Sequence, residues 1–135
     1  MSDRQRLILI VDDDYDFLEI NRIILEGAGY RVAEATNPDE ARIRIADEVP
    51  DLIITDLMME SLDAGFAFSA SLKDDPRTAD VPIIISTSVT SALGLDFRPR
   101  SAEDMAKMRV NAYFDKPIDA RALLAKVAEL LETAD

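Results

Sequence analysis

The strongest constraint on the fold is a set of short apolar runs that alternate with segments of helical periodicity. Leu7–Val11, Leu52–Thr55 and Val81–Ser86 are nearly continuous apolar runs, which is the pattern of strands buried on both faces. Strands that alternate with helices predict right-handed crossovers and a mostly parallel sheet covered by helices on both sides. The sequence therefore predicts a doubly wound α/β fold.

Two more polar segments complete the predicted sheet. Tyr30–Ala35 mixes apolar and charged residues, which is typical of an edge strand, and Ala112–Phe114 predicts a short last strand. Pro82 lacks the N–H group that a strand ladder needs, so it is tolerated only near the start of its strand. We expect these two segments and the three apolar runs to form one five-stranded sheet.

Start and stop signals predict the helices. Gly27-Ala28-Gly29 ends the first helix, Asn37 caps the second and Asp119 caps the last. Residues at helical spacing define one face of the first, third and last helices. They are Phe17, Ile20 and Ile24 in the first, Gly65, Phe68, Ser69 and Leu72 in the third, and Leu123, Val127, Leu130 and Leu131 in the last.

Composition excludes several classes of function. The 135 residues predict one domain, and the formal net charge of −12 argues against direct binding to nucleic acid or to an anionic membrane. The same charge favours a cation site or a partner with basic patches. The chain has no Cys and no His, which excludes thiolate and histidine catalysis. Its apolar runs are too short for a membrane span or a signal peptide, so we expect a cytoplasmic protein.

Polar residues follow the predicted strands directly. Asp12 and Asp13 follow the first strand, Asp56 follows the third, and Thr87 and Lys116 follow the last two. Functional sites in doubly wound folds lie beyond the carboxyl ends of the strands. We therefore expect all five side chains to converge at one end of the sheet.

Three carboxylates at one place need compensation. Two charges about 4 Å apart repel by on the order of 4 kcal/mol at an effective dielectric constant near 20. A proton, the Lys116 ammonium group or a bound cation would offset this repulsion, and Mg²⁺ is the simplest candidate because it prefers oxygen ligands. Such a site suits phosphoryl transfer, with Asp56 as nucleophile and with Lys116 and the Thr87 hydroxyl stabilising the transferring group.

Four segments resemble the marker segments of response-regulator receiver domains, the phosphorylation modules of two-component signalling. They are Leu7–Asp14, Pro50–Met59, Val81–Thr87 and Ala112–Pro117, in the order found in that family. The resemblance covers nearly the whole chain. It implies a flavodoxin-like (βα)5 sandwich, similar to chemotaxis regulators, with a five-stranded parallel sheet in the order 2-1-3-4-5. It also implies that residues 1–135 form a single receiver domain with no output domain.

The resemblance implies a function and a role for each site residue. A histidine kinase or phosphotransfer protein would phosphorylate Asp56 with Mg²⁺ as cofactor, and the modified chain, a monomer or weak dimer, would bind an unknown downstream protein. It would be no enzyme beyond its own phosphorylation and dephosphorylation. The implied metal ligands are Asp12, Asp13, Asp56 and the Met58 backbone carbonyl, the implied switch residues are Thr87 and Tyr113, and Lys116, before a cis bond to Pro117, is the implied phosphate-contacting base.

The chain departs from the family pattern in two loops. Glu60 and Ala64 stand where the family usually has Pro and Gly. The stretch between Thr87 and Lys116 is several residues longer than usual, with Gly94–Arg100 as an apparent insertion and the following helix reduced to roughly 102–108. The second departure falls where signalling specificity is expected.

Other interpretations stay open at this point. The acidic run could be a solvated turn, and Thr87, Tyr113 and Lys116 could be ordinary strand-end residues. A degenerate receiver acting as an unphosphorylated scaffold is one alternative. An aspartate-nucleophile phosphatase is another, although Met58 stands where such enzymes usually have a second acid. A flavodoxin-like cofactor carrier is a third, although the acidic loop would repel a flavin phosphate.

Overall fold

A computed structural model describes residues 5–56, 68, 70–87, 111–115 and 118–134 of the chain. Its centre is a five-stranded parallel sheet in the order β2-β1-β3-β4-β5, which confirms the predicted doubly wound order. The strands are β1 (Leu7–Val11), β2 (Arg31–Ala35), β3 (Leu52–Thr55), β4 (Ile83–Thr87) and β5 (Ala112–Asp115).

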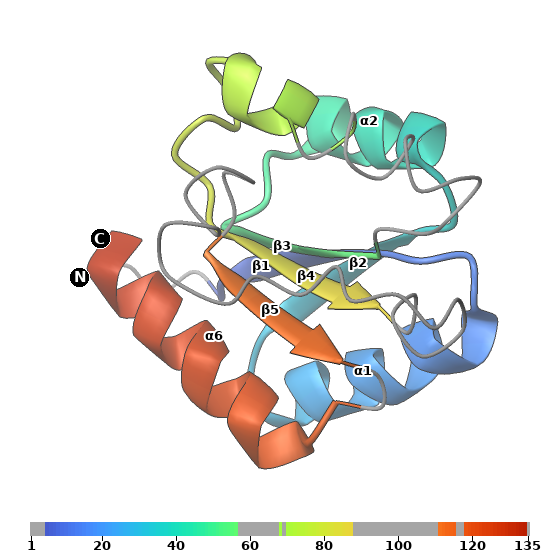
Figure 1. The fold of residues 1–135 in the computed structure, drawn as a ribbon, viewed down its shortest axis with the longest axis vertical. Coiled ribbons are helices and arrows are strands. Elements are labelled where there is room, and N and C mark those ends of the chain that lie inside the picture. Colours follow the sequence, from blue (N-terminus) through green and yellow to red (C-terminus); the bar gives the residue numbers. More distant parts are fainter. Residues whose placement is uncertain (1–4, 57–67, 69, 88–110, 116–117, 135) are drawn as a thin grey trace.

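Helices cover both faces of the sheet (Figure 1). α1 (Tyr15–Gly27) and α6 (Ala120–Ala134) lie on one face. α2 (Pro38–Asp47) lies on the other face, beside the helical residues 70–74. The molecule is therefore a three-layer sandwich, as strands alternating with helices predict.

Alternate residues of the central strands feed two separate cores. Ile8 and Ile10 pack in the cluster beneath α1 and α6, while Leu9 and Val11 pack in the cluster beneath α2. Side chains alternate between the faces of a strand, so a strand covered on both sides must be apolar throughout. All five residues of β1 are accordingly buried.

Capping residues fix the ends of the helices, and Asn37 and Asp119 do so as predicted. Asp14 caps α1, and its Oδ1 accepts two backbone N–H groups of the first turn at 3.0 and 3.3 Å. Asn37 and Asp119 each accept one first-turn N–H group, at 2.8 and 2.9 Å. Gly29 follows α1 with a φ of 98°, a left-handed conformation that favours glycine.

The predicted buried face of α1 is wrong at one position. Ile20 is 57% exposed, whereas Phe17 and Leu25 are buried as part of a stripe that also contains Leu18 and Asn21. Positions 17, 21 and 25 lie one above another on a helix, and Ile20 lies beside this stripe on its solvent side. Asn21 is accommodated in this stripe because its amide donates to the carbonyl oxygen of Phe17 at 2.8 Å.

Strand bounds differ slightly from the predicted ones. β4 begins at Ile83 rather than Val81, since Pro82 contributes only its carbonyl oxygen, which accepts from the Ile53 N–H group at 3.0 Å. β2 begins one residue later than predicted, and β5 extends one residue further, to Asp115.

Several predictions lie outside the described residues. They include the Gly94–Arg100 insertion, the helix near 102–108 and the cis bond before Pro117. Phe68 and Leu72 are buried as expected for the third helix. Among the helices of the described part, none is both long and apolar enough to cross a membrane.

Candidate metal and phosphoacceptor site

Three carboxylates gather at the carboxyl end of the sheet. One oxygen from each of Asp12, Asp13 and Asp56 lies within 4.8 Å of the other two. Asp12 is 0% and Asp56 is 5% exposed, while Asp13 is exposed. The three acids that the sequence predicts at one end of the sheet thus lie close together in the structure.

The backbone of the sheet holds the two buried acids in place. The Asp12 N–H group donates to the carbonyl oxygen of Ala35 at 3.0 Å, and the Asp56 N–H group donates to that of Val11 at 3.0 Å. These bonds extend the β1–β2 and β1–β3 ladders by one residue. Asp12 Oδ1 also accepts the Asp14 N–H group at 2.9 Å, which ties the first acid to the start of α1.

The chemistry of this donor set fits a hard divalent cation. Carboxylate oxygens are the ligands that Mg²⁺ and Ca²⁺ prefer, and the exposed side leaves room for water and for an added phosphate oxygen. Three negative charges this close repel one another, and a cation between them turns repulsion into attraction. The site could therefore hold a cation beside two buried carboxylates.

The other predicted site residues are only partly described. Thr87 and Tyr113 lie on β4 and β5, where Thr87 is opposite Asp115 and Tyr113 is opposite Ile85. The side chains of Thr87 and Tyr113 lie outside the described part of the structure, as do Met58 and Lys116 altogether. Their predicted roles therefore stay predictions.

Two features near the acids were missed from the sequence. Ser86 is 0% exposed although polar, and it follows directly after the apolar part of β4. Tyr15, Ile20 and Ile23 of α1 are 74%, 57% and 57% exposed, so the helix that starts at the acids carries an apolar outer face. The predicted strand Val81–Ser86 already placed Ser86 among buried residues, but the prediction gave its hydroxyl group no role at the site.

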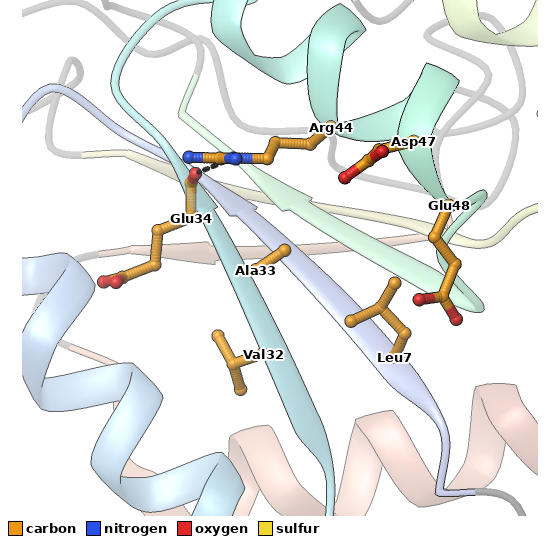
Figure 2. Close-up of a pocket in the computed structure, with 7 residues that line it drawn as sticks. All are labelled: Leu7, Val32, Ala33, Glu34, Arg44, Asp47 and Glu48. Atoms are coloured by element: carbon orange, nitrogen blue, oxygen red, sulfur yellow. Dashed lines mark hydrogen bonds between the residues drawn. The ribbon is translucent and has the colours of Figure 1, made fainter.

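A hollow of about 360 Å³ lies elsewhere, at the edge strand β2 (Figure 2). Its Arg44 and Glu48 side chains are already engaged in hydrogen bonds. Arg44 Nε donates to the carbonyl oxygen of Glu34 at 3.2 Å, and Glu48 accepts two hydrogen bonds from Arg31 at 3.0 and 2.6 Å. This hollow resembles a braced sheet edge rather than a reaction site.

Comparison with known proteins identifies the family. Residues 8–128 match the family described as response regulator receiver domain. The chain belongs to this family. Receiver domains are signalling modules of two-component systems, and the fold and the acid cluster of this receiver domain agree with that membership.

Individual relatives are similar along nearly the whole chain. The DNA-binding dual master transcriptional regulator RpaA of Synechocystis is 35% identical over 95% of this chain and 50% of its own length. The phosphate regulon transcriptional regulatory protein PhoB of Pseudomonas aeruginosa is 35% identical over 93% of this chain and 52% of its own. A putative response regulator from Chloroflexus aurantiacus superposes with a TM-score of 0.80 at 26% identity, covering 96% of this chain and 99% of that one. The receiver domain spans about half the length of these two curated relatives.

Proposed function

We propose that this receiver domain is the phosphoacceptor of a two-component phosphorelay and that Asp56 carries the phosphoryl group. The observation that carries the proposal is the cluster of Asp12, Asp13 and Asp56, with ligand atoms within 4.8 Å of one another at the carboxyl end of the sheet. Asp56 is the acid of the three that lies at the middle strand of the sheet and is nearly buried. A buried carboxylate beside a cation site is suited to nucleophilic attack on phosphorus.

In the proposed reaction, a carboxylate oxygen of Asp56 attacks the phosphorus of a phosphohistidine on the donor protein. The new P–O bond forms as the P–N bond breaks, and the leaving imidazole takes up a proton. Bound Mg²⁺, held by Asp12, Asp13, Asp56 and the Met58 backbone carbonyl, would supply positive charge that neutralises the phosphoryl oxygens. The fixed backbone of Asp56 keeps the nucleophile oriented at no further entropic cost.

The remaining family residues complete the proposal. Lys116 contacts the phosphoryl group, the Thr87 hydroxyl donates to one of its oxygens, and Tyr113 on the neighbouring strand changes position in response. Asp56 would thereby act as a switch for binding another protein. The chain catalyses no reaction other than its own phosphorylation and dephosphorylation in this proposal.

The exposed apolar side of α1 offers a surface for the donor. Tyr15, Ile20 and Ile23 project from the helix that starts at the acid cluster, so a histidine kinase or phosphotransfer protein seated there has its histidine near Asp56. Asp16 and Glu19 lie on the same helix and are exposed, which favours a donor with basic residues around an apolar contact.

The proposed partners are proteins rather than nucleic acid. RpaA is described as DNA-binding, but the matched segment is about half of that protein, and this chain has a net charge of −12. Duplex DNA repels such a surface. We propose that residues 1–135 form one receiver domain, which acts in the cytoplasm as a monomer or weak dimer.

Intact mass after incubation with Mg²⁺ and acetyl phosphate tests this proposal. A single phosphoryl adduct should form, should require Mg²⁺ and should be absent from Asp56→Ala and Asp56→Asn. Asp47→Ala, an exposed acid on α2 away from the cluster, is the matched control and should be phosphorylated like the wild type. An adduct that persists in both Asp56 variants, or a folded wild type that forms none with acetyl phosphate or a phosphorylated kinase, would contradict the proposal.

A further inference from the structure

Ser86 is a buried hydroxyl group that the proposed reaction does not use. Its side chain on β4 is 0% exposed, and no described residue is hydrogen-bonded to its Oγ. Buried hydroxyl groups are nearly always paired, because an unpaired one has lost the hydrogen bonds that water gave it. An unpaired hydroxyl beside a reaction site indicates a partner that is present in another state of the protein.

The register of the sheet places Ser86 next to Asp56. Thr55 of β3 is opposite Ile85 of β4, so the residues that follow them, Asp56 and Ser86, are lateral neighbours. The residues two positions before each of them pack in the same cluster beneath α1 and α6. Since side chains alternate along a strand, Asp56 and Ser86 leave the sheet on the same face, from strands about 4.8 Å apart.

Of the two residues that lie beside Ser86 on the adjacent strands, Asp56 is the polar one. On its other side Ser86 is opposite Phe114 of β5, which packs against the apolar cluster. Asp12 lies one strand further along, beyond Asp56, because Val11 is opposite Thr55. The oxygens of a phosphoryl group added to Asp56 would therefore lie one strand spacing from the Ser86 hydroxyl group.

We propose that Ser86 is a positioning residue whose hydroxyl donates to an oxygen of the phosphorylated Asp56 side chain. Phosphorylation adds three strong acceptor oxygens, and a serine hydroxyl changes direction by moving between staggered χ1 positions. The hydrogen bond is present in the phosphorylated state and absent from the unmodified one. Ser86 therefore stabilises the phosphorylated state selectively. This inference rests on the proposed function, because it requires a phosphoryl group on Asp56.

Binding of beryllofluoride, a phosphoryl mimic that bonds to a carboxylate oxygen, tests the inference in the presence of Mg²⁺. Ser86→Thr keeps the hydroxyl, and Ser86→Val has nearly the shape of threonine without it. Titration calorimetry should show about tenfold weaker binding for Ser86→Val than for Ser86→Thr, the effect of one hydrogen bond to a charged group. Ser86→Ala should bind more weakly than the wild type by a similar factor.

Thermal unfolding without ligand separates this role from a structural one. Ser86→Ala should unfold no more easily than the wild type, since the hydroxyl that it removes has no partner among the described residues. Equal beryllofluoride affinity in all variants, with a wild type that binds normally, would overturn the role of Ser86 and leave the proposed function intact. A folded wild type that binds no beryllofluoride would overturn both.

Discussion

The carboxyl end of the sheet and its β2 edge are both acidic, but they arrange their charges differently. At the carboxyl end, three carboxylates have oxygens within 4.8 Å of one another. At the β2 edge, the Glu48 carboxylate pairs with the Arg31 guanidinium group, and the Glu34 carboxylate lies 3.8 Å from the guanidinium group of Arg22 of α1; Figure 2 draws Glu34 and Glu48 at this edge. The first region gathers like charges, and the second alternates opposite charges.

The two arrangements of charge affect the stability of the fold in different ways. Opposite charges at the edge link β2 to the helices on either side and cost the fold little, although exposed pairs of this kind stabilise it only weakly. Repulsion between the like charges at the carboxyl end lowers the stability of the fold, and a bound cation would offset this repulsion. Among the described residues, the carboxyl end is therefore the region that a bound cation would stabilise.

Mg²⁺ should produce the largest contrast between the two regions. At a hundredfold excess over its dissociation constant, Mg²⁺ should raise the free energy of unfolding of the wild type by about 2.7 kcal/mol. Asp13→Asn should show a much smaller rise, because a charged ligand is lost. Without Mg²⁺, Asp13→Asn should melt above the wild type, because one of three repelling charges is gone. Thermal unfolding with and without Mg²⁺ measures both effects.

Glu48→Gln is the matched control, since it makes the same carboxylate-to-amide change at the β2 edge. It should keep the full stabilisation by Mg²⁺. An equal response to Mg²⁺ in Asp13→Asn and the wild type would remove Asp13 from the metal site.

In the absence of Mg²⁺, Glu48→Gln should be less stable than the wild type. Asp13→Asn should be more stable than the wild type under the same conditions. Glu48 raises the pKa of Arg31 above its ordinary value, first through the hydrogen bonds between their side chains. Replacing the carboxylate removes a charge-assisted bidentate contact. Because both side chains are partly exposed, the loss should be small and should shrink as salt screens the pair. Urea unfolding at low and high NaCl measures it, and a gain in stability would contradict the comparison.

Much of the fold was predictable because the local signals agree with the tertiary structure. The apolar runs at Leu7–Val11 and Leu52–Thr55 coincide with β1 and β3, and Asn37 and Asp119 cap their helices as predicted. Ile20 was misplaced because α1 carries apolar residues on two sides, and spacing alone does not tell which side faces the sheet. Only the packing of Phe17 and Leu25 against the sheet decides it.

The candidate site was predictable in its acids but not in Ser86. Asp12, Asp13 and Asp56 each follow the end of a strand, so topology alone brings them together. Ser86 lies one strand over from Asp56, and its position depends on the register between β3 and β4. Register is a long-range property that the sequence of β4 does not contain, so the sequence alone did not place the Ser86 hydroxyl group beside Asp56.

The smallest expected effect concerns Glu40, an acid whose neighbours donate to it rather than repel it. Its Oε1 accepts the Thr36 hydroxyl at 2.5 Å and the Thr36 N–H group at 2.7 Å, and these bonds, the hydroxyl first, lower the pKa of Glu40 below its ordinary 4.5. A lowered folded-state pKa adds stability above the ordinary value, and this stability is lost as pH falls through the folded value.

Thr36→Val keeps the shape of the side chain and removes its donor, so it should weaken this start of α2. The variant should be less stable than the wild type at neutral pH, and the two unfolding curves should converge as Glu40 becomes protonated below its lowered pKa. Denaturation measured from pH 7 down to about 3 follows the difference. A difference that stays constant over this range would show that Thr36 acts through packing instead of through the Glu40 carboxylate.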